Sequence, residues 1–475
     1  MPARLGERRT KIVGTIGPAS SSPEAVDRLI EAGLDAARLN FSHGTHADHA
    51  RGAALVREAQ DRAGRPLALI ADLQGPKVRV GDLPAPVNLP TGGDVTIAGE
   101  GAAHPDDLPI SPAVLADVVK PGNELLIDDG LVRLRVDEVN GSRARCAVLV
   151  GGPVEAHKGV NAPGIPLPVA SLTEKDLADL EFALGLGVDY VALSFVRSPD
   201  DLRGLRQRLH DAGSPALVIA KIEKAEALDA LDEIIDASDA VMVARGDLGV
   251  EVGPAAVPLL QKRIIRMALA RARPAITATQ MLESMLHHAE PTRAEASDVA
   301  NAILDGTSAL MLSGETAIGE HPTEAVATMH RIALAVEPTL RPRHGLSRTS
   351  DRGGYPTVGE AMSNAACDIA EVLRAGALLV PTFTGRTASS VARHRPRRPI
   401  IAVSHRRHAA QQLALEWGVV PVEIPEARDV EDLWARTVEA ARLAGVVEAG
   451  DRVVSTGGSA VNVPGGTNLI KVETA

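Results

Sequence analysis

The sequence feature that most constrains the fold is a repeated alternation of short apolar runs and longer helical patterns, which is interrupted once. Apolar runs at residues 11–17, 36–42 and 67–72 begin the series, and after an interruption it resumes near residue 173 and continues to about residue 340. Parallel strands need long crossover connections, which are usually helices. The alternation therefore indicates an α/β fold with a parallel sheet.

Counting the apolar runs predicts a particular α/β fold. Three expected strands precede the interruption and five follow it, at residues 188–194, 216–220, 240–244, 274–278 and 308–312. The two flanking pieces, residues 1–76 and 163–340, together have the length of about 250 residues that is typical of a (β/α)8 TIM barrel. We predict that barrel, and a doubly wound open sheet is the alternative that the pattern leaves open.

The interruption and the C-terminal third predict two further domains. Residues 77–162 are rich in Gly, Pro and Asp and contain short alternating runs, such as residues 131–136, which predict a small all-β domain inserted after the third strand. Residues 341–475 contain four more apolar runs with helical patterns between them. This region is predicted to be a C-terminal α/β domain.

Composition excludes several classes of protein. The net charge of −11 argues against a general nucleic-acid binder or a peripheral membrane protein. The sequence has neither a signal-peptide pattern nor a run of about 18 apolar residues that would cross a bilayer. Its two cysteines, Cys146 and Cys367, lie far apart, and no Cys/His cluster has zinc spacing. We expect a cytoplasmic protein.

Polar, chemically capable residues stand at the ends of three of the expected strands. Lys221 and Glu223 are two residues apart, so on a strand their side chains point the same way. Arg245 and Asp247 follow the next strand, and Thr279 follows the one after. Because barrel active sites lie at the carboxyl ends of the strands, we expect these residues to share one site. Taken singly, each could also be a strand followed by a charged loop.

These residue types favour chemistry on a phosphoryl group. Glu223 and Asp247 could share a magnesium ion, which takes carboxylate ligands and keeps other positions for phosphate and water. Lys221 and Arg38 would supply positive charge, and the Gly246 amide could hold an anion at a helix start. No Walker-type loop is present. Composition alone equally allows both charged pairs to be salt bridges on the barrel rim.

Six longer motifs resemble those of the pyruvate kinase family. They are Lys11-Ile-Val-Gly-Thr-Ile-Gly-Pro-Ala-Ser20, Ala37-Arg-Leu-Asn-Phe-Ser-His-Gly44, Ile219-Ala-Lys-Ile-Glu223, Met242-Val-Ala-Arg-Gly-Asp-Leu-Gly249, Ala278-Thr-Gln-Met-Leu-Glu-Ser-Met285 and Pro291-Thr-Arg-Ala-Glu-Ala-Ser-Asp-Val-Ala-Asn-Ala302. The resemblance extends from about residue 11 to residue 472. It implies a barrel, a β-barrel lid inserted after strand 3, a C-terminal regulatory domain and a homotetramer.

The resemblance also implies the reaction: magnesium-dependent transfer of a phosphoryl group from phosphoenolpyruvate to ADP, giving pyruvate and ATP. Lys221 would stabilise the phosphoryl group in flight and the enolate, and Arg38 would hold the substrate phosphate. Glu223 and Asp247 would bind Mg²⁺, with Mn²⁺ as a possible substitute.

Further roles follow from the same resemblance. The Gly246 and Asp247 amides would hold the substrate carboxylate. Thr279 would take part in protonating the enolate, and because a threonine hydroxyl is a weak acid we expect it to orient a water relay. The residues that the resemblance assigns to the nucleotide are Pro18, Asn40, His43, Arg79 and Lys158.

One departure from the family pattern concerns potassium. Asn40, Ser42, Asp72 and Leu73 resemble the family's monovalent-cation site, but where many members read Thr-Lys-Gly-Pro-Glu after the aspartate, this chain reads Leu73-Gln74-Gly75-Pro76-Lys77. We hypothesise that the Lys77 ammonium replaces potassium, so that K⁺ is not required. The alternative is a solvated hinge lysine.

The C-terminal region carries a second resemblance, to the family's effector loop. The segment Thr382-Phe-Thr-Gly-Arg-Thr387 has hydroxyl and N–H groups suited to an anion, and residues 464–468 resemble the opposite loop. We predict a phosphorylated allosteric effector bound by Thr382, Thr384, Gly385, Arg386 and Thr387. The arginine-rich run at residues 386–408 is otherwise expected to be a solvated face, since no aromatic residues interleave with it for nucleic-acid stacking.

Two other functions remain as alternatives. A non-catalytic, metabolite-sensing relative would be expected to lose Lys221, Glu223, Asp247 or Thr279, and all four are present. Another phosphoenolpyruvate-using barrel enzyme would lack both the lid and the Lys158 motif.

Overall fold

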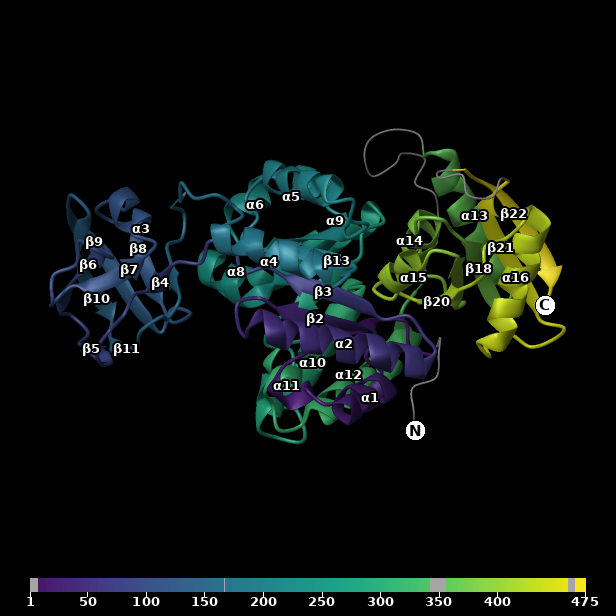
Figure 1. Ribbon diagram of the computed structural model, residues 1–475, viewed down its shortest axis with the longest axis horizontal. Coiled ribbons are helices and arrows are strands. Elements are labelled where there is room, and N and C mark those ends of the chain that lie inside the picture. The colour runs from purple at the N-terminus through teal and green to yellow at the C-terminus, as the bar shows by residue number, and fades with distance from the viewer. Residues whose placement is uncertain (1–6, 166, 342–355, 460–465) are drawn as a thin grey trace.

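The centre of the molecule is a closed barrel of eight parallel strands (Figure 1). The computed structural model describes residues 7–165, 167–341, 356–459 and 466–475. Around the barrel the strands are β1 (Lys11–Thr15), β17 (Ala309–Leu312), β16 (Ala275–Ala278), β15 (Ala240–Ala244), β14 (Leu217–Ile222), β13 (Tyr190–Leu193), β3 (Ala68–Asp72) and β2 (Ala36–Asn40). The predicted TIM barrel is confirmed, and the open-sheet alternative is wrong.

Helices outside the barrel strands follow the predicted pattern closely. They are α1 (Pro23–Ala32), α2 (His46–Ala63), α4 (Glu174–Gly185), α5 (Pro199–Asp211), α6 (Glu226–Asp229), α7 (Leu231–Ala237), α9 (Val257–Ala270), α10 (Arg293–Asp305) and α12 (Pro322–Val336). Ser22, Thr45 and Thr173 cap the first three as N-cap acceptors. Two helices, α6 and α7, lie between β14 and β15, because Ala230 leaves the helical conformation (φ −107°, ψ 23°).

The segment between β3 and β13 folds separately as a β-rich lid domain, which we call the lid. Its strands are β4 (Arg79–Val80), β5 (Val87–Leu89), β6 (Asp94–Gly99), β7 (Leu108–Ser111), β8 (Glu124–Ile127), β9 (Val132–Asn140), β10 (Arg143–Val150), β11 (Gly152–Val154) and β12 (Val160–Asn161), with one short helix, α3 (Val114–Val118). Seven strands form one sheet, from β12 to β4. Backbone hydrogen bonds from Val80 to Lys158 (2.8 Å) and from Val160 to Val78 (2.9 Å) join its two edges, so the sheet curls back on itself.

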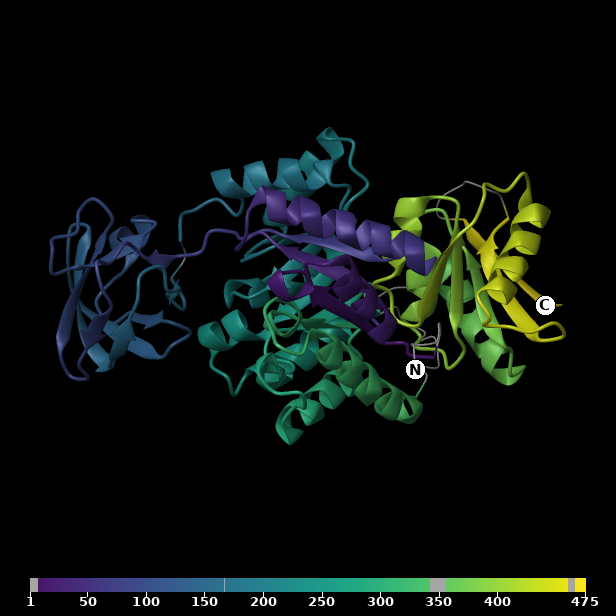
Figure 2. The ribbon, with the colours of Figure 1, turned by 60° about the horizontal axis from the view of Figure 1, so that its bottom comes forward.

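The C-terminal region is an α/β unit built on a five-stranded sheet. Its strands, in order across the sheet, are β20 (Val419–Glu423), β19 (Ile400–Ser404), β18 (Ala377–Pro381), β21 (Arg452–Gly458) and β22 (Thr467–Thr474), with helices α13 (Val358–Val372), α14 (Arg386–Ala392), α15 (Arg407–Leu413) and α16 (Val430–Leu443). The antiparallel β22 was not predicted. The lid and this unit lie at opposite ends of the barrel in both views (Figures 1 and 2). The exact boundaries at residues 76/77, 162/163 and 340/341 stay predictions.

The C-terminal unit closes one end of the barrel. Leu415, which follows α15, is fully buried and packs with barrel residues such as Val13 and Ile70 in a single apolar cluster. Around it, the Tyr190 hydroxyl donates to the Gln412 carbonyl at 2.9 Å. Because Tyr190 begins β13, this contact marks the N-terminal end of the barrel. The predicted site residues lie at the opposite end, where the strands finish.

A search of the described residues finds no helix with the length and hydrophobicity of a membrane span.

Candidate active site

Lys221 lies at the centre of the residues that the sequence singled out. It is near the end of β14, and its Nζ lies 3.0 Å from Glu223 Oε1 and 3.1 Å from Asp72 Oδ1. The same ammonium donates to Ser194 Oγ at 2.6 Å. Lys221 and Glu223 do form a salt bridge, but it is buried, with side-chain exposures of 12% and 2%. A simple solvated rim pair does not describe it.

Asp72 links this lysine to Arg38. Arg38, on β2, donates from Nε to Asp72 Oδ2 at 2.7 Å and from Nη1 to Thr15 Oγ1 at 3.1 Å. Burial acts to raise the pKa of Asp72, but the charges of Lys221 and Arg38 outweigh it and lower the pKa. In the same way, burial acts to lower the pKa of Lys221, and Asp72 and Glu223 outweigh it and raise the pKa. The raised pKa favours the charged ammonium of Lys221, and the lowered pKa favours the carboxylate of Asp72 between this ammonium and the Arg38 guanidinium.

Glu223 and Asp247 have the chemistry of a hard-cation site. The Phe195 amide donates to Glu223 Oε2 at 2.7 Å, which fixes this carboxylate at the barrel mouth. Burial is the main cause that raises the pKa of Glu223; Lys221 opposes it, and the nearby charge of Asp247 raises it further. A divalent cation between these carboxylates would relieve that repulsion. Within the described residues no cluster of three or more His, Cys, Asp or Glu could hold a metal. The remaining ligands would have to come from substrate and water, as Mg²⁺ commonly arranges.

Arg245 and Asp247, the second charged pair that the sequence suggested, have other partners in the structure. Arg245 begins α8 (Arg245–Val252) and pairs with Asp298 at 2.6 Å, while the ammonium of Lys77 lies 4.0 Å from Asp247. The Gly246 amide donates to Thr279 Oγ1 at 2.9 Å. The N–H group expected to bind an anion is thus held by the Thr279 hydroxyl, which itself donates to the Ala278 carbonyl at 2.6 Å.

A cavity of about 760 Å³ opens beside Arg38 and contains three of the predicted nucleotide residues, Pro18, Asn40 and His43. Burial is the first cause that lowers the pKa of His43, and the nearby charges of Arg79, Arg38 and Lys77 lower it further. The cavity is therefore next to a concentration of positive charge, to which the lid contributes Arg79.

Lys158 is placed differently from the other predicted nucleotide residues. Its Nζ pairs with Asp128 at 3.2 Å and with Glu155 at 3.7 Å, and both carboxylates belong to the lid. The neighbouring Asp129, in contrast, lies close enough to the barrel for a barrel charge to affect it. Burial is the largest cause that raises the pKa of Asp129, and the charge of Asp247 is the second. The structure thus brings this face of the lid near the barrel mouth without pairing Lys158 to a barrel residue.

The residues that resemble a monovalent-cation site are partly engaged with one another. Asn40 Oδ1 accepts a hydrogen bond from the Ser42 amide at 3.2 Å. The Leu73 carbonyl accepts one from Ser194 Oγ at 2.7 Å. Lys77 is directed toward Asp247 rather than toward these groups. Its ammonium is nonetheless a fixed positive charge at the same barrel mouth.

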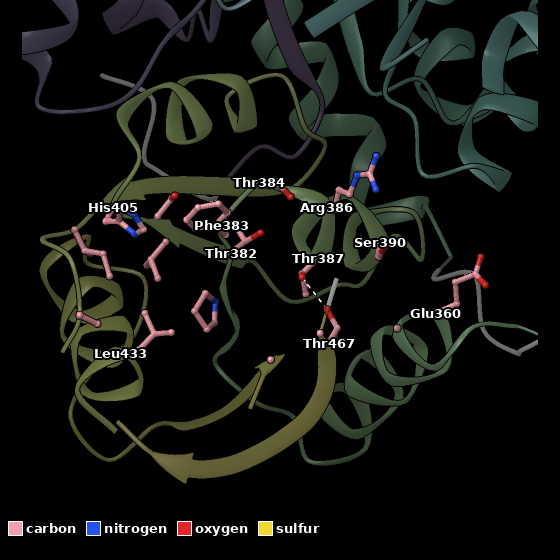
Figure 3. Close-up of a pocket in the computed structure, with 18 of the residues that line it drawn as sticks. Glu360, Thr382, Phe383, Thr384, Arg386, Thr387, Ser390, His405, Leu433 and Thr467 are labelled. Atoms are coloured by element: carbon pink, nitrogen blue, oxygen red, sulfur yellow. Dashed lines mark hydrogen bonds between the residues drawn. The ribbon is translucent and has the colours of Figure 1, made fainter. Parts of the chain in front are cut away.

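The predicted effector residues gather around a separate cavity of about 190 Å³ in the C-terminal unit (Figure 3). Thr382, Thr384, Arg386 and Thr387 line it. Gly385 has the left-handed φ of +84° that glycine adopts readily, and its amide donates to Thr382 Oγ1 at 3.0 Å. The loop is therefore tightly turned at the start of α14.

The opposite side of this cavity is formed by the start of β22. Thr467 Oγ1 lies 2.8 Å from Thr387 Oγ1, which joins the two sides (Figure 3). Of the predicted opposite loop, Pro464 and Gly465 lie outside the described residues. Arg386 extends away from Thr382 and Thr387 in Figure 3. It also lines a second cavity with barrel residues that include Arg203 and Arg206.

Two residues of the site had no role in the sequence interpretation. Ser194 stands at the carboxyl end of an expected strand, where the site was predicted, but its hydrogen bonds with Lys221 and with the Leu73 carbonyl were not predicted. Asp298 pairs with Arg245 across two helices that are far apart in the sequence. No local pattern predicts that contact.

Comparisons with known proteins agree along the chain. A family model described as "Pyruvate kinase, barrel domain" matches residues 7–326, and one described as "Pyruvate kinase, alpha/beta domain" matches residues 360–473. The chain is 44% identical over 472 residues to the pyruvate kinase of Geobacillus stearothermophilus, covering 98% of this chain and 80% of the relative. It is 45% identical over 471 residues to that of Corynebacterium glutamicum, covering 98% and 97%. For the pyruvate kinase of Clostridium acetobutylicum, identity is 42% over 470 residues, covering 98% and 99%.

Proposed function

The chain belongs to the pyruvate kinase family of phosphotransferases, and from that membership we propose how its own residues divide the transfer of a phosphoryl group from phosphoenolpyruvate to ADP. One observation carries the proposal: Arg38, Asp72, Lys221 and Glu223, from three strands of the barrel, form one buried ion network at its mouth. Phosphoryl transfer depends mainly on positioning and on electrostatic stabilisation, which such a network supplies.

In this proposal Lys221 is the principal catalytic cation. Asp72 and Glu223 keep its ammonium charged and Ser194 orients it, so it is prepared to stabilise the phosphoryl group and then the enolate. Arg38 holds the substrate phosphate. Glu223 and Asp247 would hold magnesium, which when bound supplies positive charge for the phosphoryl oxygens. Manganese would fit the same oxygen ligands.

Thr279 serves the second half of the reaction, the protonation of the enolate carbon. Its hydroxyl is too weak an acid to give up its proton readily, so it orients water that delivers the proton. Substrate binding changes its partner: the substrate carboxylate takes the Gly246 and Asp247 amides, which frees Thr279 Oγ1 from the Gly246 N–H bond at 2.9 Å.

The nucleotide occupies the cavity beside Pro18, Asn40 and His43. Arg79 and Lys158 approach its phosphates from the lid, and Lys158 exchanges Asp128 for phosphate as it does so. Closure of the lid excludes water, which would otherwise compete for the phosphoryl group.

The test is an assay that follows pyruvate from phosphoenolpyruvate and ADP, with and without magnesium. Formation of pyruvate that requires the metal supports the proposal. A folded chain that binds phosphoenolpyruvate without turnover would instead be a metabolite sensor, and turnover of phosphoenolpyruvate without ADP would identify a different barrel enzyme.

For the monovalent cation, we propose that Lys77 makes potassium unnecessary. The supporting observation is that its ammonium lies 4.0 Å from the carboxylate of Asp247, a predicted metal ligand. A side chain 30% exposed retains only part of such an interaction in water, so the effect depends on closure of the lid.

For regulation, we propose that the cavity at Thr382–Thr387 binds a phosphorylated metabolite and that the enzyme is a homotetramer of the cytoplasm. The hydroxyl groups of Thr382 and Thr387, together with amides at the start of α14, are donors suited to phosphate oxygens. The measurement is the saturation curve for phosphoenolpyruvate with a sugar phosphate or nucleoside monophosphate present, and a curve that never shifts would refute the proposal.

A further inference from the structure

The turn that follows β16 has an unfavourable backbone conformation. Thr279 and Gln280 have φ values of +68° and +51°, so two consecutive residues other than glycine lie in the left-handed region. Such a conformation is especially unfavourable for a β-branched residue, and it persists only where the surroundings enforce it. The turn sets the direction in which the Thr279 hydroxyl points.

The side chain of Arg245 supplies that enforcement. Its Nη2 donates to the Thr279 carbonyl at 2.8 Å and to the Gln280 carbonyl at 3.2 Å, and its Nε donates to the Ala278 carbonyl at 3.3 Å. One guanidinium therefore contacts the carbonyls of three successive residues. The planar, multi-donor geometry of arginine makes this possible, and a lysine has no equivalent.

Asp298 fixes the guanidinium from the other side. Its Oδ2 lies 2.6 Å from Arg245 Nη1, and Asp298 belongs to α10 rather than to the barrel rim. The arginine side chain is only 11% exposed. Because the backbone of Arg245 leads directly into Gly246, whose amide bonds Thr279 Oγ1, the same short segment holds both the backbone and the hydroxyl of Thr279.

We propose that Arg245, anchored by Asp298, is a positioning residue for enolate protonation: it holds the left-handed turn at Thr279–Gln280 and thereby sets the position of the Thr279 hydroxyl. This rests on the proposed role of Thr279. The Arg245 guanidinium is engaged by the carbonyls of the turn and by Asp298, so we expect its effect to fall on the proton step more than on substrate affinity.

The test uses the proton step in reverse. With pyruvate and magnesium in D₂O, the enzyme breaks a methyl C–H bond, releases the proton to solvent and forms a C–D bond from the enolate, which proton NMR follows directly. We expect Arg245→Lys to slow this exchange by about tenfold or more, the scale of positioned proton transfer. The KM for phosphoenolpyruvate should stay within about twofold, as for a group that acts only after binding.

Arg57→Lys is the matched control, because Arg57 makes the same kind of contacts at the opposite end of the barrel. It donates to the Leu67 and Gly187 carbonyls and pairs with Asp189 at 2.9 Å. Arg57→Lys should lower the melting temperature without slowing exchange. If both variants slow exchange equally, or if Arg245→Lys exchanges at the wild-type rate, the proposal is wrong.

Asp298→Asn gives a second, milder route should Arg245→Lys fold poorly, since Asp298 is 38% exposed. We expect it to slow exchange in the same direction, and the double variant to be no slower than Arg245→Lys alone, because both changes act through one contact. Additive losses would contradict the proposal. If the wild type exchanges protons but forms no pyruvate from phosphoenolpyruvate, the proposed function fails and the positioning role does not.

Discussion

The ammonium of Lys221 lies 3.1 Å from the carboxylate of Asp72, and that carboxylate also accepts a hydrogen bond from Arg38 at 2.7 Å. One aspartate therefore lies between two cations that we propose act on the same phosphoryl group. One carboxylate cannot neutralise two positive charges, and Glu223 supplies a second negative charge beside Lys221.

Replacing the lysine should separate catalysis from folding. We expect Lys221→Met to lower kcat by about three orders of magnitude, because it removes a preorganised charge from the transition state. The variant should still fold, because each buried carboxylate retains one hydrogen bond. Asp72 still accepts from Arg38, and Glu223 still accepts from the Phe195 amide. Lys224→Met is the control: Lys224 has the same 12% side-chain exposure but pairs with Glu251. Near-normal turnover in Lys221→Met, or equal losses in both variants, would contradict the assignment.

Removal of a carboxylate should weaken metal binding. We expect Glu223→Gln and Asp247→Asn each to reduce affinity for Mn²⁺, measured by the electron paramagnetic resonance of free ion, by about tenfold or more. The control is Glu251→Gln. Because Glu251 pairs with Lys224 and is not one of the proposed metal ligands, this variant should bind Mn²⁺ as the wild type does. Unchanged binding in both site variants would exclude this pair as the metal ligands.

Reversing the charge at Lys77 should create a need for potassium. We expect the wild type to run at similar rates in potassium and in tetramethylammonium buffers. Lys77→Glu should be slow in the second and should recover with added potassium, because the variant lacks the fixed cation near Asp247. Strong potassium activation of the wild type would refute the idea, and Lys175→Glu, on the exposed start of α4, controls for net charge.

The effector cavity should respond to loss of one hydroxyl group. We expect Thr387→Val to abolish the shift that a phosphorylated ligand causes in the phosphoenolpyruvate curve, while activity without that ligand stays unchanged. The reason is that Thr387 lines the cavity of the C-terminal unit (Figure 3), and this unit packs against the end of the barrel opposite the proposed active site. Thr328→Val, in α12 of the barrel, should retain the shift. A retained shift in Thr387→Val would move the effector to another site.

Stability should fall on acidification because of His394. Burial, with Arg393 as the next cause, lowers the pKa of His394 to about 4. An unfolded chain has a histidine pKa of about 6.5, so between these values the unfolded state binds more protons, and stability present above pH 6.5 is lost as the pH falls. His394→Gln should flatten the melting temperature over this range, and the exposed His210→Gln should not. An unchanged acid slope in His394→Gln would disprove the assignment.

Local sequence rules predicted much of the barrel and the direction of its key side chains. The two-residue spacing predicted that Lys221 and Glu223 project on the same side at the end of one strand, because side-chain alternation along a strand is a short-range effect. β22 was missed, since much of its surface is exposed and its apolar pattern is weak.

Long-range pairing is where sequence reasoning stopped. The sequence around Arg245 does not indicate whether it pairs with Asp247, two residues away, or with Asp298, which is its partner in the structure. Likewise, the sequence placed Asp72 in a cation site, whereas its contacts to Arg38 and Lys221 depend on the closure of the barrel. Such contacts follow from the strand order and not from spacing.

Leu415 at the closed end of the barrel bears on whether the barrel can be separated from the C-terminal unit. At this end the apolar cluster combines residues that begin barrel strands, such as Tyr190, with Leu415, which comes from the C-terminal unit. Excising that unit would leave an apolar socket open to water beneath the catalytic end. We therefore expect that the barrel is not an independently stable domain. Part of its apolar core is supplied by the C-terminal unit, which is the region that we expect to regulate it.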